Sequence, residues 1–248
     1  MSEKVLIAKG DQKEIYRVGD KTYKSFEPGF PKAEVLNEAM NTARVEETDL
    51  NIPKVLAVTV EDGRWTIVKE YIEGKTLAEL MEEHPEKKRE YLEKLVDLQI
   101  EVNSKKCPLL NRLKEKLARQ IDSVKELDDI TRYDLQTRLD GMPKHLKLCH
   151  GDFEPKNIIV QGDKYYIIDW VHAAQGNASA DAARTYLLLA LEDQKTADEY
   201  LEMFCEKTET AKTYVQKWLP IVAAAQLTKK RPQEKELLMR WLDVVDYE

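Results

Sequence analysis

The stretch that decides the fold runs from residue 150 to residue 170 and reads His150-Gly151-Asp152-Phe153-Glu154-Pro155-Lys156-Asn157, then Ile158-Ile159-Val160, Gln161-Gly162-Asp163-Lys164, Tyr165-Tyr166-Ile167-Ile168 and Asp169-Trp170. Its two apolar runs predict strands, and the glycine and aspartate between them predict a turn that joins the strands into a hairpin. Such a hairpin brings Asp152, Asn157 and Asp169 to one end of an otherwise apolar β unit. The stretch therefore predicts a polar site at the end of this hairpin.

Asp152, Asn157 and Asp169 are the side-chain types that phosphoryl transfer requires. One carboxylate orients the attacking hydroxyl and receives its proton, while a second carboxylate and a neutral amide oxygen hold Mg²⁺ against the phosphates. Each residue alone also fits an ordinary turn or cap, because Asp and Asn are common at both. The ordered combination of an Asp, an Asn and a hairpin that leads to a second Asp is much harder to obtain by chance.

The segments His150-Gly151-Asp152, Asn157 and Ile168-Asp169-Trp170 together resemble the motifs of the aminoglycoside phosphotransferase and choline kinase-like family, which is related to the protein kinases. The resemblance extends over nearly the whole chain and is most specific in its middle. It implies that Asp152 is the catalytic residue and that Asn157 and Asp169 are the Mg²⁺ ligands. It also implies that His150 braces the catalytic loop and has a structural role.

The same resemblance places a nucleotide site in the N-terminal part of the chain. Kinases pair a strand lysine with a helix glutamate at the phosphates, and Lys24 and Glu38 occur in that order. The alternative is an edge-strand lysine that faces water and a solvated glutamate. Tyr71 and Ile72 fall in a segment that resembles the family's hinge, where backbone groups meet the adenine. The phosphate-covering loop expected at residues 9–14 contains one glycine, against three in protein kinases.

Asp181 and Arg184 lie in a predicted helix and resemble the residues with which the family supports its catalytic loop. The alternative is that both are ordinary charges on an exposed helix surface. Glu154 occupies the position where protein kinases have a lysine, two residues after the catalytic Asp. In addition, only residues 170–180 separate Asp169 from Asp181, which is too short for a peptide-docking activation segment. These departures disfavour a protein kinase.

The pattern of the chain changes after about residue 73. The first part reads as strands around one helix, whose apolar face is predicted to comprise Val35, Leu36, Ala39, Met40 and Ala43. The second part reads as helices interrupted by the hairpin. We therefore expect an α+β, bilobal, protein-kinase-like fold. A small β-rich nucleotide-binding lobe would span residues 1–72, and a larger, mainly helical lobe for catalysis and acceptor binding would span residues 73–248.

The composition describes an ordinary globular chain of 248 residues with a net charge of −7 at pH 7. This acidic balance argues against an extended nucleic-acid surface, which needs clustered Lys and Arg. The three cysteines suggest neither a zinc site nor a disulfide framework. No apolar run is long enough for a signal peptide or a membrane span, so we expect a cytoplasmic protein without nucleic-acid or membrane partners.

These observations predict an ATP-dependent, Mg²⁺-requiring kinase that phosphorylates a hydroxyl of a small molecule, with Asp152 as catalytic base and ATP between the lobes. A compact atypical protein kinase and a non-catalytic nucleotide-binding scaffold are the alternatives. The identity of the acceptor stays open. Because Asp152, Glu154 and Asp169 are expected near the cleft mouth, a focused negative field would favour a cationic acceptor. Solvated helix faces are an equally good explanation of the acidic charge.

Overall fold

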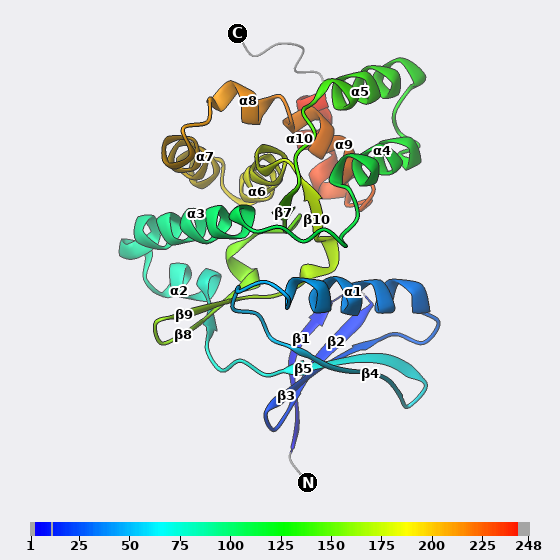
Figure 1. Ribbon diagram of the computed structural model, residues 1–248, viewed down its shortest axis with the longest axis vertical. Helices are drawn as coiled ribbons and strands as arrows, with labels where there is room; N and C mark the ends of the chain where they lie inside the picture. Colours follow the sequence, from blue (N-terminus) through cyan, green and yellow to red (C-terminus); the bar gives the residue numbers. More distant parts are fainter. Residues whose placement is uncertain (1–2, 11, 243–248) are drawn as a thin grey trace. The chain divides into compact units, whose positions relative to one another are not determined.

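The computed structural model describes residues 3–10 and 12–242 and divides into two compact units. The first unit combines Met1–Pro85 with Pro155–His172, and the second combines Glu86–Glu154 with Ala173–Glu248. Figure 1 labels the helices and strands along the chain. This division differs from the expected lobes, because the boundary lies after Pro85 and the hairpin that follows Asp152 groups with the N-terminal residues.

The first unit is built on a five-stranded antiparallel sheet in the order β1-β2-β3-β5-β4. Its strands are β1 (Lys4–Gly10), β2 (Lys13–Val18), β3 (Lys21–Phe26), β4 (Val55–Glu61) and β5 (Arg64–Glu70). Tight turns join β2 to β3 at Gly19-Asp20 and β4 to β5 at Asp62-Gly63. Gly19, Asp62 and Gly63 adopt positive φ angles of 62°, 51° and 74°, which tight turns require and which Gly and Asp tolerate best.

Helix α1 (Lys32–Val45) covers one face of this sheet. Val35 and Ala39 are buried there against Phe26 and Ile67. The predicted apolar face was only partly correct, because the side chains of Leu36, Met40 and Ala43 are exposed. The helix is rotated so that Glu38, Thr42 and Val45 share the buried side instead. A pattern of apolar residues alone misplaces this face, because its central residue is a glutamate.

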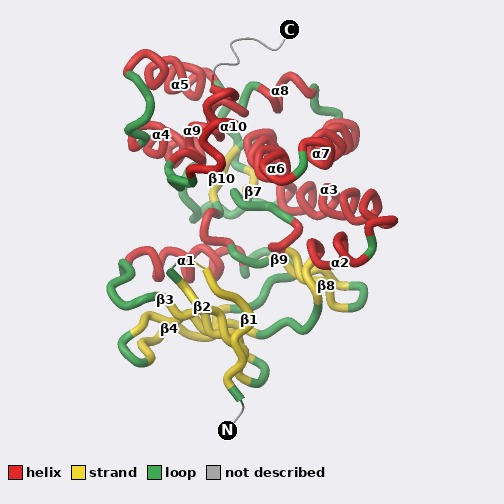
Figure 2. The backbone as a smooth tube through the Cα atoms, turned by 180° about the vertical axis from the view of Figure 1, so that it is seen from behind, coloured by secondary structure: helices red, strands yellow, loops and turns green. Residues whose placement is uncertain are grey.

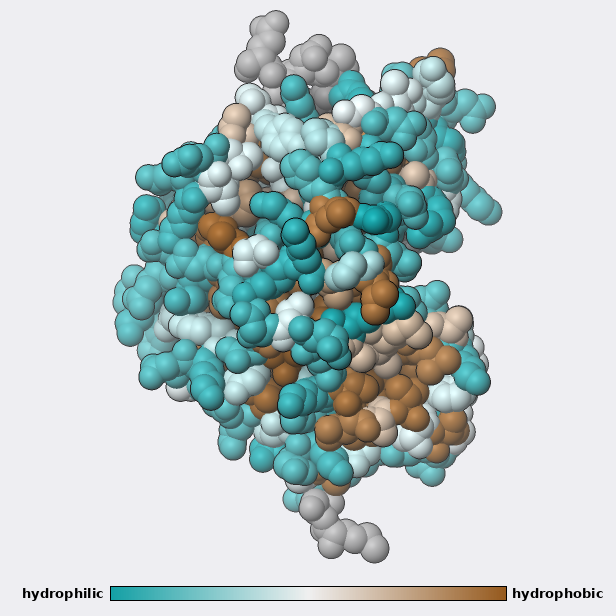
Figure 3. Space-filling model, in the orientation of Figure 1, coloured by the Kyte–Doolittle hydropathy of each residue, from teal (hydrophilic) through white to brown (hydrophobic). Residues whose placement is uncertain are grey.

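The surface of the first unit keeps several large apolar side chains in solvent. They are Val5, Leu6 and Ile7 of β1, Leu36 and Met40 of α1, and Leu56 and Val60 of β4. Figure 3 shows apolar side chains gathered on this part of the molecule.

A second, three-stranded sheet completes the first unit, in the order β6-β8-β9. Its strands are β6 (Lys75–Thr76), β8 (Ile158–Gln161) and β9 (Lys164–Ile167), flanked by the 3₁₀ turns η2 (Pro155–Asn157) and η3 (Trp170–His172). The predicted hairpin is therefore present, with its turn at Gly162 (φ 57°). The turn η3 packs on α1, where Asn41 Nδ2 donates to the Val171 carbonyl oxygen at 3.2 Å. Helix α2 (Leu77–Glu83) packs on η2 and begins with a capping box formed by Thr76 and Glu79.

The second unit is helical, with one short strand pair at its centre. Its helices are α3 (Lys88–Ser104), α4 (Leu113–Ser123), α5 (Asp129–Gly141), α6 (Ala178–Glu192), α7 (Gln194–Thr208), α8 (Lys212–Gln216), α9 (Leu219–Leu227) and α10 (Pro232–Leu242), with η1 (Pro85–Lys87) at the unit boundary. The strands β7 (Lys147–Cys149) and β10 (Ala174–Gly176) pair antiparallel and were not expected from the sequence. Figure 2 separates the helices from these strands by colour.

The core of the second unit lies around α6 and α9. Every residue of α9 is buried, and Trp218, Tyr200 and Phe204 are among the largest fully buried side chains. Burial of these apolar side chains helps to hold the helices in place. Among the described residues, no helix is both long enough and apolar enough to cross a membrane.

The close approach of Gly74 to β8 yields a prediction about stability. A Cβ atom at this position would lie 2.1 Å from the Val160 carbonyl oxygen, which is backbone and has little room to move. We expect Gly74→Ala to lower the free energy of unfolding by about 1–3 kcal/mol, measured by chemical denaturation.

The matched control for that measurement is Gly141→Ala. A Cβ at residue 141 meets nothing within 4 Å, and the position lies in the last turn of α5. This control should leave stability unchanged or raise it by up to about 1 kcal/mol. Equal effects of the two substitutions would show that the close contact at Gly74 does not hold the hairpin.

Candidate functional site

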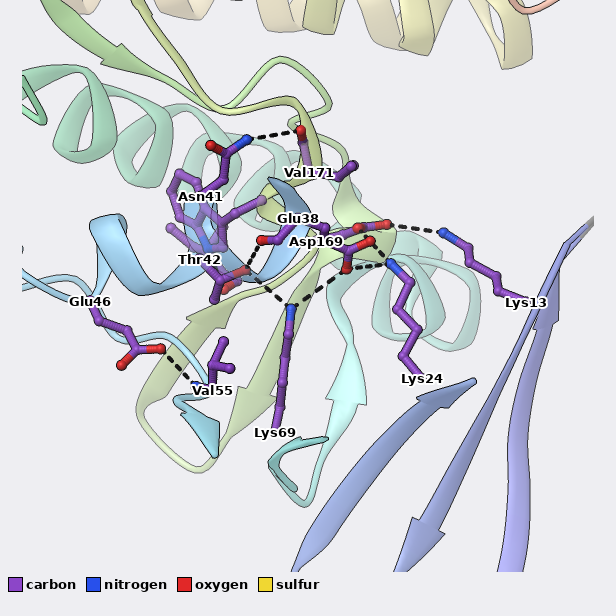
Figure 4. A network of polar contacts seen from close by, with 12 residues as sticks. Lys13, Lys24, Glu38, Asn41, Thr42, Glu46, Val55, Lys69, Asp169 and Val171 are labelled. Carbon is purple, nitrogen blue, oxygen red and sulfur yellow. Dashed lines mark hydrogen bonds and ion pairs between the residues drawn. The ribbon is translucent and has the colours of Figure 1, made fainter. Parts of the chain in front are cut away.

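Three lysines and two carboxylates form a buried network in the first unit (Figure 4). Lys24 Nζ donates to Glu38 Oε1 at 2.6 Å and to Asp169 Oδ1 at 3.2 Å. The predicted ion pair between Lys24 and Glu38 is therefore confirmed, and the side chain of Lys24 is only 9% exposed. Lys24 is thus not an edge-strand lysine that faces water. One ammonium group links β3, α1 and the segment that follows β9.

The local structure explains why these groups meet. Lys24 lies directly across from Ile67 in the sheet, so it shares the face that α1 covers. Glu38 points toward this face from the buried side of α1. Asp169 comes directly after the second strand of the hairpin and has a positive φ of 63°. A non-glycine residue in this conformation carries some strain, which is typical of residues whose side chain must point in a set direction.

Two further lysines belong to this network and were missed in the sequence. Lys69 Nζ lies 3.7 Å from Glu38 Oε1 and donates to Thr42 Oγ1 at 3.2 Å. Lys13 Nζ lies 3.7 Å from Asp169 Oδ2. The alternation of side chains along β5 could have predicted the position of Lys69. Lys69 lies two residues after buried Ile67 and so points to the same core-facing side.

The charges of the network do not cancel, because three ammonium groups surround two carboxylates. Burial opposes ionisation of Asp169, but Lys24, Lys13 and Lys69 outweigh it and hold the pKa of Asp169 well below its usual range. Burial likewise disfavours the charged form of Lys24, yet Asp169 and Glu38 outweigh it and raise the pKa of Lys24. Burial dominates at Lys69 and lowers its pKa. The network is therefore a partly buried site with an excess of positive charge.

Asn157 lies beside Asp169 at the same end of the hairpin. The Ile168 N–H donates to the Asn157 carbonyl oxygen at 2.9 Å, next to the paired residues Ile158 and Ile167. The two residues at this end of the hairpin thus have a carboxylate and an amide side chain, the types that supply the oxygen ligands that Mg²⁺ prefers. In residues 3–10 and 12–242, no group of three or more His, Cys, Asp or Glu side chains is arranged to hold a metal ion. Mg²⁺ is commonly held by one or two carboxylates together with substrate phosphates, and this donor set fits that mode.

The expected hinge residues follow β5 in the first unit. The Tyr71 N–H donates to the Asp20 carbonyl oxygen at 2.9 Å, and Arg17 lies over the Tyr71 ring with 4.0 Å from Cζ to the ring centroid. Ile72 is half-buried in the connection to β6. Within the expected phosphate-covering loop, Asp11 lies outside the described residues.

The buried carboxylate of Asp181 on α6 organises the segment that carries Asp152 in the second unit. Asp181 Oδ1 accepts from the Gly151 N–H at 2.8 Å, and Oδ2 accepts from the His150 N–H at 3.2 Å. The side chains of Gln99 and Asn103 on α3 donate to Oδ2 at 3.3 Å and 3.1 Å. Asp181 is 2% exposed, so it is not a helix-surface charge. Its carboxylate fixes the backbone directly before Asp152.

His150 and Arg184 also contact the segment that carries Asp152. His150 is fully buried, and its Nδ1 accepts from the Asp152 N–H at 3.2 Å. Its ring contacts Phe153 edge-on, with 5.6 Å between the ring centroids. Arg184 Nε donates to the Gly151 carbonyl oxygen at 3.3 Å, and its Nη2 lies 3.7 Å from Asp152 Oδ1. The expected structural role of His150 and the expected support from α6 are consistent with these contacts.

The structure thus distributes the predicted site residues between the two units. The first unit contains Lys24, Glu38, Tyr71, Ile72, Asn157 and Asp169, and the second contains His150, Asp152, Asp181 and Arg184. Within the first unit, Lys24, Glu38 and Asp169 are brought into direct contact. Within the second, Asp181 and Arg184 contact the segment of His150, Gly151 and Asp152.

Comparison with known proteins gives matches along the whole chain. A model of the phosphotransferase enzyme family (APH) matches residues 7–233. In sequence, the chain is 33% identical over 63 residues to protein LicA of Haemophilus influenzae, which covers 25% of this chain and 23% of that protein. A second LicA protein of the same species matches at 33% over 63 residues, or 18% of its length. The chain spans less than a quarter of the curated relatives that it matches.

Solved structures resemble the chain over nearly its full length. A thermostable mutant of aminoglycoside phosphotransferase APH(4)-Ia, in ternary complex with ADP and hygromycin B, has a TM-score of 0.72 at 13% identity and covers 97% of this chain and 90% of its own. Aminoglycoside-3'-phosphotransferase of type VIII has a TM-score of 0.64 at 17% identity, with 98% and 93% covered. A choline/ethanolamine kinase family protein from Mesorhizobium loti has a TM-score of 0.60 at 15% identity, with 100% and 88% covered. The expected α+β, protein-kinase-like fold is therefore confirmed.

The role of Asp181 can be tested through stability. Asp181→Asn keeps the size of the side chain but turns one acceptor oxygen into a donor that faces other N–H groups. A buried donor left without an acceptor costs about 1–3 kcal/mol, so we expect the free energy of unfolding in urea to fall by that amount.

Asp97→Asn is the matched control, because Asp97 forms a surface ion pair with Lys207 at 2.6 Å and its side chain is 45% exposed. Exposed pairs contribute between zero and about 1 kcal/mol. If Asp181→Asn were no more destabilising than Asp97→Asn, the buried carboxylate would not be what organises the Asp152 segment.

Proposed function

The chain belongs to the phosphotransferase enzyme family, and from that premise we propose that it is an ATP-dependent, Mg²⁺-requiring kinase whose acceptor is a hydroxyl of a small molecule. In the proposed reaction, the acceptor oxygen forms a bond to the γ-phosphorus while the bond between that phosphorus and the ADP oxygen breaks. The hydroxyl proton passes to the carboxylate of Asp152. The products are ADP and the phosphorylated acceptor.

The observation that carries the proposal is the excess of positive charge around Lys24. Three lysines face two carboxylates in this network, so a polyanion can enter without leaving a buried charge uncompensated. Lys24 is fixed by Glu38, which supports an ammonium aimed at the nucleotide phosphates in the manner of other kinases. The structure of APH(4)-Ia, which has a similar fold, contains ADP in its ternary complex, and this supports a nucleotide as the ligand.

Asp169 and Asn157 are the residues that we propose to hold Mg²⁺. Asp169 stays ionised over a wide pH range because the three lysines lower its pKa, so it is ready to bind a cation. Asn157 adds an amide oxygen from the same end of the hairpin without adding charge. When bound, Mg²⁺ would neutralise charge that develops on the phosphate oxygens.

Asp152 is the residue that we propose to orient the acceptor hydroxyl and receive its proton. Its backbone N–H is bound by His150, and the backbone of the preceding residue is bound by Asp181 and Arg184. The carboxylate itself is partly exposed, with 22% of its side-chain surface in solvent, so it remains accessible to a substrate. A base held in this way contributes through its fixed position and through proton transfer.

The metal assignment predicts different effects for two substitutions. Asp169→Ala should abolish Mg²⁺-dependent ATP binding, measured by calorimetry, whereas Asn157→Ala should weaken it less, because Asp169 supplies a full charge and Asn157 a dipole. Asp163→Ala, in the exposed turn of the same hairpin, is the control and should bind Mg·ATP as the wild type does. Unchanged binding in Asp169→Ala would contradict the assignment.

The catalytic assignment predicts a separation of binding from turnover. Asp152→Asn should leave nucleotide affinity within a few-fold and lower kcat by about 10²–10⁴, the usual range for loss of a positioned base. Asp134→Asn, an exposed change on α5, should retain full activity. Full turnover of an accepted substrate by Asp152→Asn would remove Asp152 from the mechanism.

A further inference from the structure

Four basic residues are brought to the Asp152 segment by helices of the second unit. Lys116 lies on α4 and Arg184 on α6, while Lys229 and Arg231 lie in the connection from α9 to α10. Helices α4, α6 and α10 all pack against α9. The four residues lie near one another, because Arg184 and Lys229 interact electrostatically with Lys116, and Arg231 interacts with Arg184. None of them except Arg184 was singled out in the sequence. We refer to these four residues as the basic cluster.

Arg184 is the member of the basic cluster with direct contacts to the catalytic segment. Its Nη2 lies 3.7 Å from Asp152 Oδ1, and its Nε donates to the Gly151 carbonyl oxygen. Its side chain is 13% exposed, whereas that of Arg231 is 49% exposed. The cluster therefore extends from the partly buried Asp152 carboxylate outward to solvent.

Three acidic residues near the basic cluster are buried, and one of them pairs with a member of the cluster. Asp181 accepts hydrogen bonds from two backbone N–H groups and two side-chain amides. Glu234 accepts from Gln226 Nε2 at 2.6 Å and from Arg231 Nη1 at 2.9 Å. Glu154 is only 5% exposed. Among Asp152, Glu154, Asp181 and Glu234 in the described part of the chain, Asp152 alone is partly exposed to solvent, whereas Lys229 and Arg231 of the basic cluster are exposed.

The electrostatics of Lys116 indicate how strongly the cations crowd one another. Burial, with Arg184 and Lys229 acting in the same direction and Asp152 and Asp181 in the opposite one, lowers the pKa of Lys116 to about 8. Lys116 is thus still mostly protonated at neutral pH. An anion placed among these groups would relieve their mutual repulsion.

We propose that the acceptor of this kinase carries an anionic group, a phosphate or a carboxylate, in addition to the hydroxyl that is phosphorylated. The basic cluster would bind that group beside Asp152. This inference rests on the proposed function and replaces the expectation of a cationic acceptor. That expectation placed Glu154 at the site's mouth, but Glu154 is buried, and the accessible neighbours of Asp152 are basic.

The first experiment compares matched acceptors that differ in charge. ADP formation from Mg·ATP is measured with glycerol, serinol, glycerate and glycerol 3-phosphate, and with glucose, glucosamine, glucuronate and glucose 6-phosphate. If the enzyme phosphorylates compounds of the glycerol series or of the glucose series, an anionic compound of that series should have a kcat/KM at least about tenfold above the neutral and cationic ones. Its KM should rise with added KCl, because salt screens the attraction. Preference for the neutral or cationic member would overturn the proposal.

The second experiment needs no turnover and uses inorganic phosphate and acetate as probes. Each is titrated calorimetrically into the full chain, with and without saturating Mg·AMP-PNP, and into the double variant Lys229→Gln/Arg231→Gln. Both substituted side chains are exposed, so the variant should fold. We expect it to bind the favoured probe at least about fivefold more weakly than the wild type. The control Lys195→Gln, on α7 with an 84% exposed side chain, should bind it as the wild type does.

The outcomes distinguish this inference from the proposed function. If the wild type binds neither probe more tightly than the double variant, the basic cluster is no anion site and the inference is overturned, whatever the nucleotide result. If Mg·AMP-PNP does not bind, the proposed kinase activity fails, while the difference in anion affinity is still measured. The probe that binds with the higher affinity indicates whether the anionic group of the acceptor is a phosphate ester or a carboxylate.

Discussion

The ammonium group of Lys24 joins three segments of the first unit that are far apart in sequence: β3, α1 and the residue that follows β9. A buried lysine of this kind is stable only if carboxylates reach it, so Glu38 must lie on the buried face of α1 and Asp169 must turn inward at the end of the hairpin. The rotation of α1, the exposure of Leu36 and Met40, and the positive φ of Asp169 all follow from this one constraint. Removing either carboxylate alone would leave Lys24 with a single carboxylate partner and would increase the excess of positive charge in the network.

The second unit depends on a comparable arrangement in which the buried charge is negative. Here the buried group is the carboxylate of Asp181, and the surrounding donors are backbone and side-chain N–H groups and not cations. Because its hydrogen bonds are used on the protein itself, Asp181 contributes rigidity and not chemistry. The carboxylate of Asp152, directly after the bound backbone of Gly151, keeps part of its surface in solvent and is the group that we propose contacts the substrate.

The sequence predicted the parts of the site that depend on local order. The pairing of Lys24 with Glu38, and the hairpin that places Asn157 beside Asp169, follow from strands, turns and motif order, which short-range patterns describe well. Lys13, Lys69 and the basic cluster were missed, because their meeting depends on helix packing and on which face of a strand is buried. The three-residue strands β7 and β10 were missed because they are too short to show a period of two. Glu154 was expected near the cleft mouth but is buried, and its burial is a tertiary property that the sequence pattern does not show.

The most direct test of the account is the position of the metal in a nucleotide complex. Crystals of the chain with AMP-PNP and Mn²⁺ in place of Mg²⁺ would locate the ion by its anomalous scattering. We predict an ion bound to an Asp169 carboxylate oxygen and to the Asn157 side-chain oxygen, with Lys24 still paired to Glu38 and contacting a phosphate. An ion bound away from both residues, or a nucleotide whose phosphates do not approach Lys24, would contradict the central claim that the buried network of the first unit is the nucleotide site.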